Sequence, residues 1–94
     1  MIIGVCVAKL YLPGVHSLKA KRGQLKSLLA RLPREFNLAV AEIDDHDLWQ
    51  SAQIALVTVN NDLGRTQALL EKAVRWVEHH RPDLTIVDHQ IEIR

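Results

Sequence analysis

Apolar residues recur with two different spacings along this chain, and the order in which the spacings alternate constrains the fold more than any other feature. One helical stripe runs from Leu18 to Leu32, and a second runs from Leu63 to Val77. Four other segments are rich in β-branched and apolar residues, which favours strands. The expected strands are residues 1–12, 36–44, 50–60 and 84–94. The predicted order of elements is therefore βαββαβ.

Capping and breaking residues place the ends of the two expected helices. Ser17 should cap the start of the first helix, and Pro33 should end it. Asn61 or Asp62 should cap the second helix, and the proline-containing segment 81–83 should end it.

The order βαββαβ is typical of a ferredoxin-like α+β sandwich, in which two helices cover one face of a four-stranded antiparallel sheet. A chain of 94 residues should form a single domain spanning 1–94. In the last strand, the alternation places His89 on the inward side. We therefore expect His89 to be a packed or interface histidine.

The first and third expected strands carry apolar residues at both odd and even positions, and therefore on both faces. In the first strand, Val5 and Val7 alternate with Cys6 and Ala8. Helices can cover only one face of the sheet, so the other face should be an exposed apolar patch that needs a partner. The simplest partner is a second copy, and we expect a homodimer.

The charged residues form two blocks of opposite sign. The first 34 residues hold seven Lys or Arg and no acid, whereas residues 35–62 hold six acids and no Lys or Arg. This asymmetry indicates either a basic surface for nucleic acid or two halves of one fold that neutralise each other.

Neutralisation within the fold follows from the predicted topology. A right-handed crossover brings the end of the second strand to the same edge of the sheet as the start of the first helix. Lys21 and Arg22 both fall beside the leucine stripe, where a cation needs an acidic partner. The expected structural ion pairs involve Lys21, Arg22, Glu42, Asp44, Asp45 and Asp47.

If the basic block faces outward instead, the first helix is a candidate surface for RNA. Its candidate nucleic-acid-binding residues are Lys19, Arg22, Lys26, Arg31 and Arg34. Contacts from these cations to phosphates would make binding sensitive to salt. RRM-type base stacking is disfavoured, because the third strand has no aromatic residue and the first has only Tyr11, at its end.

Other kinds of site have less support from the residues. The acidic run 44–47 lacks the spacing and the glycine of a calcium loop, and the single cysteine cannot build a zinc site, so no metal is expected. The chain has no phosphate loop, dinucleotide fingerprint or nucleophile elbow. We therefore expect neither a cofactor nor an enzymatic activity.

Two alternative functions stay open beside RNA binding. The Leu12-Pro13-Gly14 turn before a helix resembles the ligand-holding loop of small amino-acid-sensing domains with this fold, which suggests a small-ligand-sensing regulatory dimer. A protein-interaction module without catalysis is the other. The chain shows no signal peptide and no run long enough to span a bilayer, so we expect a cytoplasmic protein without a membrane partner.

Several motifs taken together resemble the YlxP-like family of small bacterial proteins, a domain of unknown function. They are Leu12-Pro13-Gly14, Ser17-Leu18-Lys19-Ala20-Lys21-Arg22, Phe36-Asn37, Ala41-Glu42-Ile43-Asp44-Asp45, Asp47-Leu48-Trp49-Gln50 and Asn60-Asn61-Asp62. The resemblance implies a ferredoxin-like fold. It also implies a place beside ribosome-maturation and translation-initiation proteins, because such genes are often neighbours, but it supplies no catalytic residue. Ala20 departs from the acid found there in many relatives, which makes the first helix more basic.

Overall fold

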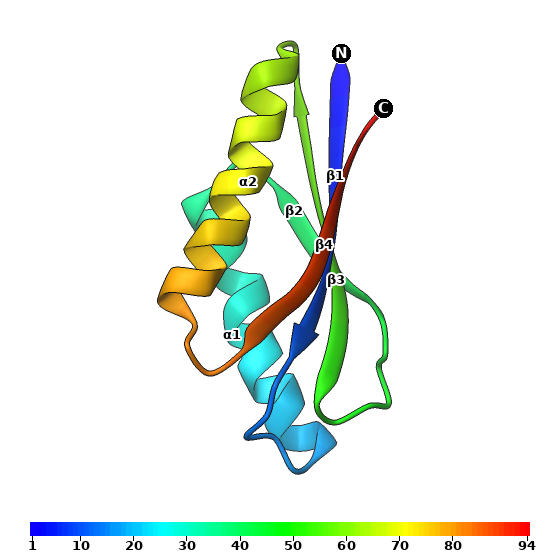
Figure 1. Ribbon diagram of the computed structural model, residues 1–94, viewed down its shortest axis with the longest axis vertical. Coiled ribbons are helices and arrows are strands. Elements are labelled where there is room, and N and C mark those ends of the chain that lie inside the picture. Colours follow the sequence, from blue (N-terminus) through cyan, green and yellow to red (C-terminus); the bar gives the residue numbers. More distant parts are fainter.

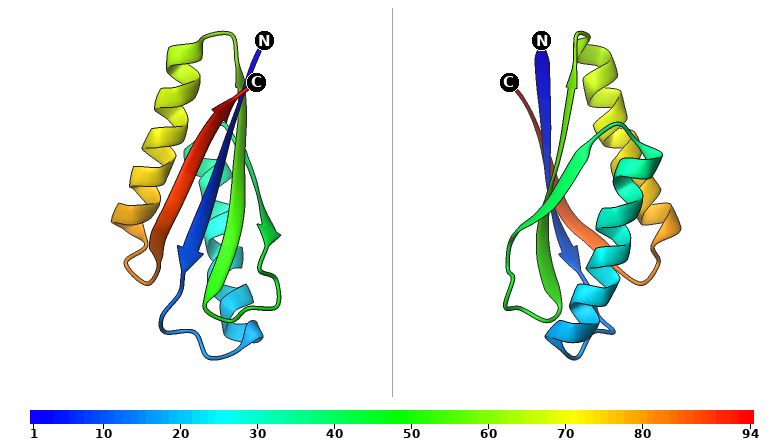
Figure 2. Two further views of the ribbon diagram at one scale, coloured as in Figure 1. Left: turned by 45° about the vertical axis from the view of Figure 1, so that its right-hand side comes forward. Right: turned by 180° about the vertical axis from the view of Figure 1, so that it is seen from behind.

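The computed structural model describes all 94 residues and has the element order βαββαβ (Figure 1). The elements are β1 (Ile2–Tyr11), α1 (Leu18–Glu35), β2 (Ala39–Asp44), β3 (Ser51–Asn60), α2 (Leu63–His80) and β4 (Thr85–Ile93). The strands form one sheet in the order β2-β3-β1-β4, and every neighbouring pair is antiparallel. Both helices lie on the same side of the sheet (Figure 2). The predicted ferredoxin-like α+β fold is confirmed.

The two helices begin where their capping residues predict, but α1 ends later than expected. The Ser17 side chain accepts a hydrogen bond from the Ala20 amide at 3.1 Å, and Asp62 caps α2 in the same way. The prediction that Pro33 ends α1 is wrong, since the helix continues to Glu35. A proline this close to the end removes one backbone hydrogen bond, and the fully buried Leu32 holds the last turn in place.

The core lies between the helices and the inner face of the sheet. Its buried residues on β1 and β3 are Cys6, Ala8, Leu10, Ala52, Ile54 and Leu56, and those on the helices include Leu25, Leu28, Leu32, Leu70, Val74 and Val77. Burying each leucine stabilises the fold by roughly 1.5–3 kcal/mol. Gly4 marks the closest approach of α2, because a Cβ there would collide with the Thr66 side chain.

The outer face of the sheet is apolar and has no covering element. Val5 lies opposite Val57 in the β1–β3 register, and Ile3 lies opposite Val59, a residue that is 54% exposed. No helix covers this side (Figure 2). The outer face of β1 and β3 is thus an exposed apolar surface, as the two-sided apolar character of these strands predicts.

Strand β4 departs from the simple alternation that the sequence suggests. A bulge opposite Lys9 and Leu10 changes its register, so that Ile86 packs on the core and Val87 is exposed. His89 lies opposite the buried Ala8 but is itself exposed. Of the two expectations for His89, packing within the chain is therefore wrong, because β4 is an edge strand and leaves this residue exposed. A place at an interface stays a prediction.

The two ends of the chain lie side by side. Ile3 and Arg94 exchange a pair of backbone hydrogen bonds of 2.9 and 2.7 Å between β1 and the end of β4. Both termini therefore leave the molecule at the same end, as Figure 1 shows. Neither α1 nor α2 has a stretch long and apolar enough to cross a membrane.

Candidate functional site

The fold separates charges by layer. The two helices carry nine of the twelve Lys and Arg residues and three of the eleven acids. The strands and loops carry the remaining three cations and eight acids. Because both helices lie on one side of the sheet, their outward surface forms a basic helical face.

All five cations expected to bind nucleic acid are exposed on α1. Lys19, Arg22 and Lys26 share one flank, and Gly23 beside them has no neighbouring atom within 4 Å of a Cβ position. None of these three cations has an ion-pair partner. This flank is therefore free to contact an external anion.

Arg31 and Arg34 occupy different positions on the same helix. The Arg31 guanidinium lies 3.3 Å from Glu35 and 5.1 Å from the centre of the Trp76 ring, so that it faces α2. Arg34 lies in the last turn of α1, is exposed and has no ion-pair partner. The five candidate residues thus spread around α1 and do not form a single stripe.

Helix α2 contributes cations that the sequence analysis did not select. Arg65, Lys72 and Arg75 are exposed and fall within about 80° of one another around the helix axis. Glu71 and Glu78 lie one helical turn from Arg75, within about 60° of it around the axis, and form no ion pair with it. The balanced charge count after residue 62 concealed this group of cations, which their helical spacing could have revealed.

A groove of about 830 Å³ lies between the last turn of α1 and the neighbouring flank of α2. We call it the Trp76 groove. It is lined by Glu35, Phe36, Asn37, Arg65, Ala68, Leu69, Lys72, Arg75, Trp76, His79 and His80. The Phe36 and Trp76 rings meet edge to face at 6.2 Å, and the His80 ring stacks on Trp76 at 4.7 Å. The groove therefore combines an aromatic floor with a cationic rim.

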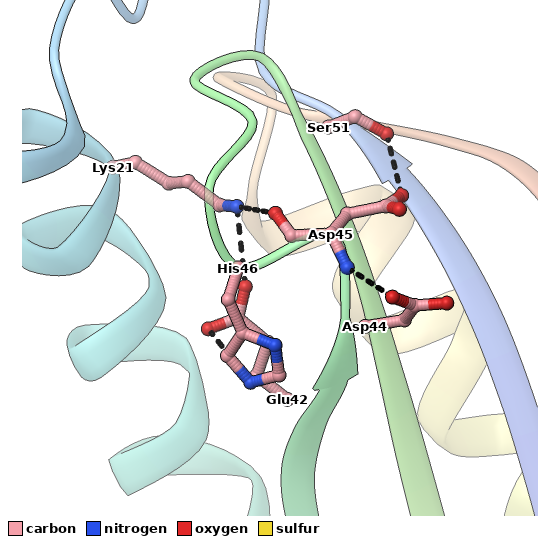
Figure 3. Close-up of polar contacts among 6 residues, drawn as sticks. All are labelled: Lys21, Glu42, Asp44, Asp45, His46 and Ser51. Carbon is pink, nitrogen blue, oxygen red and sulfur yellow. Dashed lines mark hydrogen bonds and ion pairs between the residues drawn. The ribbon is translucent and has the colours of Figure 1, made fainter.

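Lys21 points away from the basic helical face and into the fold (Figure 3). Its Nζ atom lies 3.2 Å from Glu42 Oε2, and only 2% of its side chain is exposed. The same Nζ donates a hydrogen bond to the backbone carbonyl of Asp45. The Glu42 oxygen has no aligned hydrogen bond, so its attraction to Lys21 is mainly Coulombic.

The remaining groups of this cluster hold the loop between β2 and β3. Asp45 has a positive φ of 63° and accepts a hydrogen bond from the Ser51 hydroxyl at 3.0 Å. Asp44 accepts one from the Asp45 amide at 2.8 Å, and His46 lies 4.0 Å from Glu42 (Figure 3). These bonds fix the start of the loop.

The expected ion-pair network is smaller than the sequence analysis predicts. Arg22 forms no ion pair, because it lies about 100° further round the helix than Lys21 and faces solvent. The carboxylates of Asp44, Asp45 and Asp47 make no ion pair with a cation either. Asp45 meets Lys21 through its backbone carbonyl, so only Lys21 and Glu42 of the predicted set form the pair.

A second hollow, of about 620 Å³, lies where the loop after β1 meets the loop after β2. It is lined by Tyr11, His16, Asp47, Leu48, Trp49, Gln50 and Ser51. The Gln50 side chain donates hydrogen bonds to the carbonyls of Pro13 and Val15 and joins the two loops. This hollow borders the Pro13-Gly14 turn, where the small-ligand alternative places its ligand.

Two titratable groups are shifted by their surroundings. Burial raises the pKa of the Cys6 thiol to about 11, so the thiol stays protonated at neutral pH. Hydrogen bonds from Arg81 hold the pKa of the Asp83 carboxyl below its usual value. No three potential metal ligands come together in the structure.

The fold and the site define a small α+β sandwich with one basic helical face and one apolar sheet face. Residues 3–91 match the family described as "Protein of unknown function (DUF503)". The chain belongs to the DUF503 family. It is similar to the "Uncharacterized protein YlxP" of Bacillus subtilis (strain 168), with 27% identity over 77 residues, which cover 82% of this chain and 84% of that protein. The resemblance to YlxP-like proteins is confirmed.

Proposed function

We propose that this protein binds RNA, free or in ribosomal particles, through its basic helical face, and that it does so without catalysis. The observation that carries the proposal is the separation of charge between the layers. Nine of the twelve Lys and Arg residues lie on the helices, and Lys21 is the only one of the nine that is buried. Exposed cations without acidic partners are the groups that bind phosphates.

Internal neutralisation is the competing explanation for the basic block, and the structure limits it. The acidic block contributes Glu42 to the pair with Lys21, Glu35 to the pair with Arg31 and Asp62 to the pair with Arg65. The other candidate cations of α1 lack acidic partners. The charge asymmetry is therefore mostly displayed at the surface, where it can act on a polyanion.

Binding of a structured RNA at different salt concentrations tests the proposal. Contacts to two or three phosphates predict a loss of affinity of roughly 10- to 40-fold between 50 and 200 mM salt. Lys26→Glu should weaken binding and reduce the salt slope by about 1. Arg94→Glu changes the net charge equally but lies beyond β4, away from the helices, and should bind as the parent does.

Two results would contradict the proposal. The first is a parent protein that binds no RNA at low salt. The second is a Lys26→Glu variant that binds as well as the Arg94→Glu control. In either case the basic helices serve the fold alone, and a protein-interaction module becomes the better hypothesis.

We also propose that the protein is a homodimer joined through the outer face of the sheet. Ten-residue strands of about 33 Å in a sheet about 19 Å wide give roughly 600 Å² per protomer. Two such faces bury roughly 1,200 Å², the lower limit for a specific interface. Lys9 lies opposite Asp88 on this face, so a second copy can pair the charges reciprocally. Sedimentation at micromolar concentration should give twice the chain mass.

A further inference from the structure

We propose that the Trp76 groove holds an unpaired base of single-stranded RNA while cations on its rim bind the neighbouring phosphates. This inference rests on the proposed RNA-binding function and adds the class of RNA and the place where a base is held. The proposed base site uses none of the residues Lys19, Arg22 and Lys26, which form the exposed flank of α1.

The floor of the groove is apolar and partly exposed, although the His80 ring stacks on the Trp76 ring at 4.7 Å. Phe36, Leu69 and Trp76 are only partly buried, although they pack against the core. The groove is open on its outer side and has the volume of a site for a small organic group. A nucleobase is planar and stacks on aromatic rings or lies against apolar side chains.

The rim of the groove selects an anionic occupant. Arg65 and Lys72 are separated by two helical turns, about 10.5 Å along the axis, and Arg75 lies one turn further. The only acid that lines the groove is Glu35, whose carboxylate already pairs with Arg31 at 3.3 Å. Glu71 and Glu78 of α2 do not line the groove, although each lies within one helical turn of Arg75. A negative group at the rim therefore meets three cations, of which only Arg65 has an ion-pair partner, Asp62 at 3.8 Å.

The aromatic floor and the cationic rim of the groove together favour single-stranded RNA over a duplex. A base-paired helix presents phosphates but keeps its bases stacked inside, so it can use the rim and not the floor. An unpaired nucleotide can use both. Arg31 lies over the Trp76 ring and adds a guanidinium plane beside the site.

The two tryptophans of the chain allow a direct test. Trp49→Phe leaves Trp76 as the only tryptophan, because the chain has two. A short single-stranded oligouridine should quench the Trp76 emission of this variant. An RNA duplex of equal length should leave the emission unchanged, although it too binds the basic helical face.

Ala68→Phe fills the groove from an exposed position on α2, without touching the core. It should weaken single-strand binding about tenfold, the order of one stacking contact, and should leave duplex binding within about twofold. Gln67→Phe is the matched control, since it adds the same ring to the neighbouring exposed position outside the groove. It should bind both RNAs as the parent does.

The outcomes separate this inference from the function on which it rests. Unchanged Trp76 emission, or equal binding by Ala68→Phe and Gln67→Phe, overturns the base site while RNA binding stands. Quenching by polyglutamate as strong as by oligouridine also overturns it, because the groove then takes an acidic peptide. Failure of every RNA to bind at low salt overturns both.

Discussion

Lys21 Nζ lies 3.2 Å from Glu42 Oε2, at a place where 2% of the lysine side chain and 19% of the glutamate side chain are exposed. A cation this deeply buried loses most of its hydration, and the carboxylate and the Asp45 carbonyl replace it. Glu42 lies in β2 and Asp45 in the β2–β3 loop, so Lys21 connects α1 to both of these distant parts of the sequence.

Lys21→Met should lower the free energy of unfolding by about 1–3 kcal/mol, because it keeps the volume but leaves the largely buried Glu42 carboxylate unpaired. Urea unfolding measures the effect. The double variant Lys21→Met with Glu42→Leu should be more stable than Lys21→Met alone, since it removes the orphaned charge. Equal stabilities of the single and double variants would show that the ion pair contributes nothing.

Arg22→Met is the natural control for this pair. The sequence pattern predicts a similar loss there, but Arg22 is exposed and unpaired, so we now expect a change within about 0.5 kcal/mol. A loss as large as that of Lys21→Met would mean that Arg22 finds an acidic partner in solution.

Gly4→Ala should destabilise the protein by roughly 1–3 kcal/mol through overpacking against α2. The added Cβ would collide with Thr66 Cγ2 and lie 2.9 Å from Leu70 Cδ1. Adding Thr66→Ser removes Cγ2 but keeps the hydroxyl that donates to the Asp62 carbonyl at 2.8 Å, so it should restore part of the loss. Gly14→Ala, with no atom within 4 Å, should be nearly neutral in the same thermal or urea unfolding experiment.

The sequence could predict the element order because each helix and strand carries its own apolar spacing. It could not predict that Pro33 is tolerated, because that depends on how firmly Leu32 is held by the core. The bulge in β4, which turns Ile86 to the core and leaves Val87 exposed, depends on pairing with β1 across the whole chain.

The candidate site was predictable only in part. Helical spacing placed Lys21 and Arg22 beside the same apolar stripe, but only the position of β2 beside α1 decides which of them meets Glu42. The Trp76 groove joins the end of α1 to α2, so no local pattern contains it. The cations of this groove belong to the stretch after residue 62, where acids and bases are equal in number, so the charge count did not reveal them.

Stability should decline in alkali because of the Cys6 thiol. Its pKa is raised to about 11 in the folded protein from an ordinary value of 9.0. The folded state thus binds the proton more tightly, and this contribution is complete below pH 9 and is lost as the pH rises towards 11. Denaturant midpoints of the parent and of Cys6→Ala, measured from pH 8 to 11, should converge if this is correct. Midpoints that run parallel would contradict it.

Val57→Lys places a charge at the centre of the outer sheet face and should convert the proposed dimer to a monomer. Val57 lies opposite Val5 in the register, away from the core. Sedimentation of this variant should give the mass of one chain, 10.7 kDa. Its circular dichroism spectrum should stay that of the parent, which separates loss of the dimer from loss of the fold. A variant that still dimerises would move the interface to another surface.

The backbone exchange between Ile3 and Arg94 makes the fold nearly a closed ring. A few flexible residues could join the two ends, and the chain could instead be opened in the exposed stretch between Asp45 and Trp49. Such a circular permutant would keep all four strands and both helices while starting at β3. The permutant would follow the elements in a different order along the chain. The layered arrangement of basic helices over the sheet does not depend on that order.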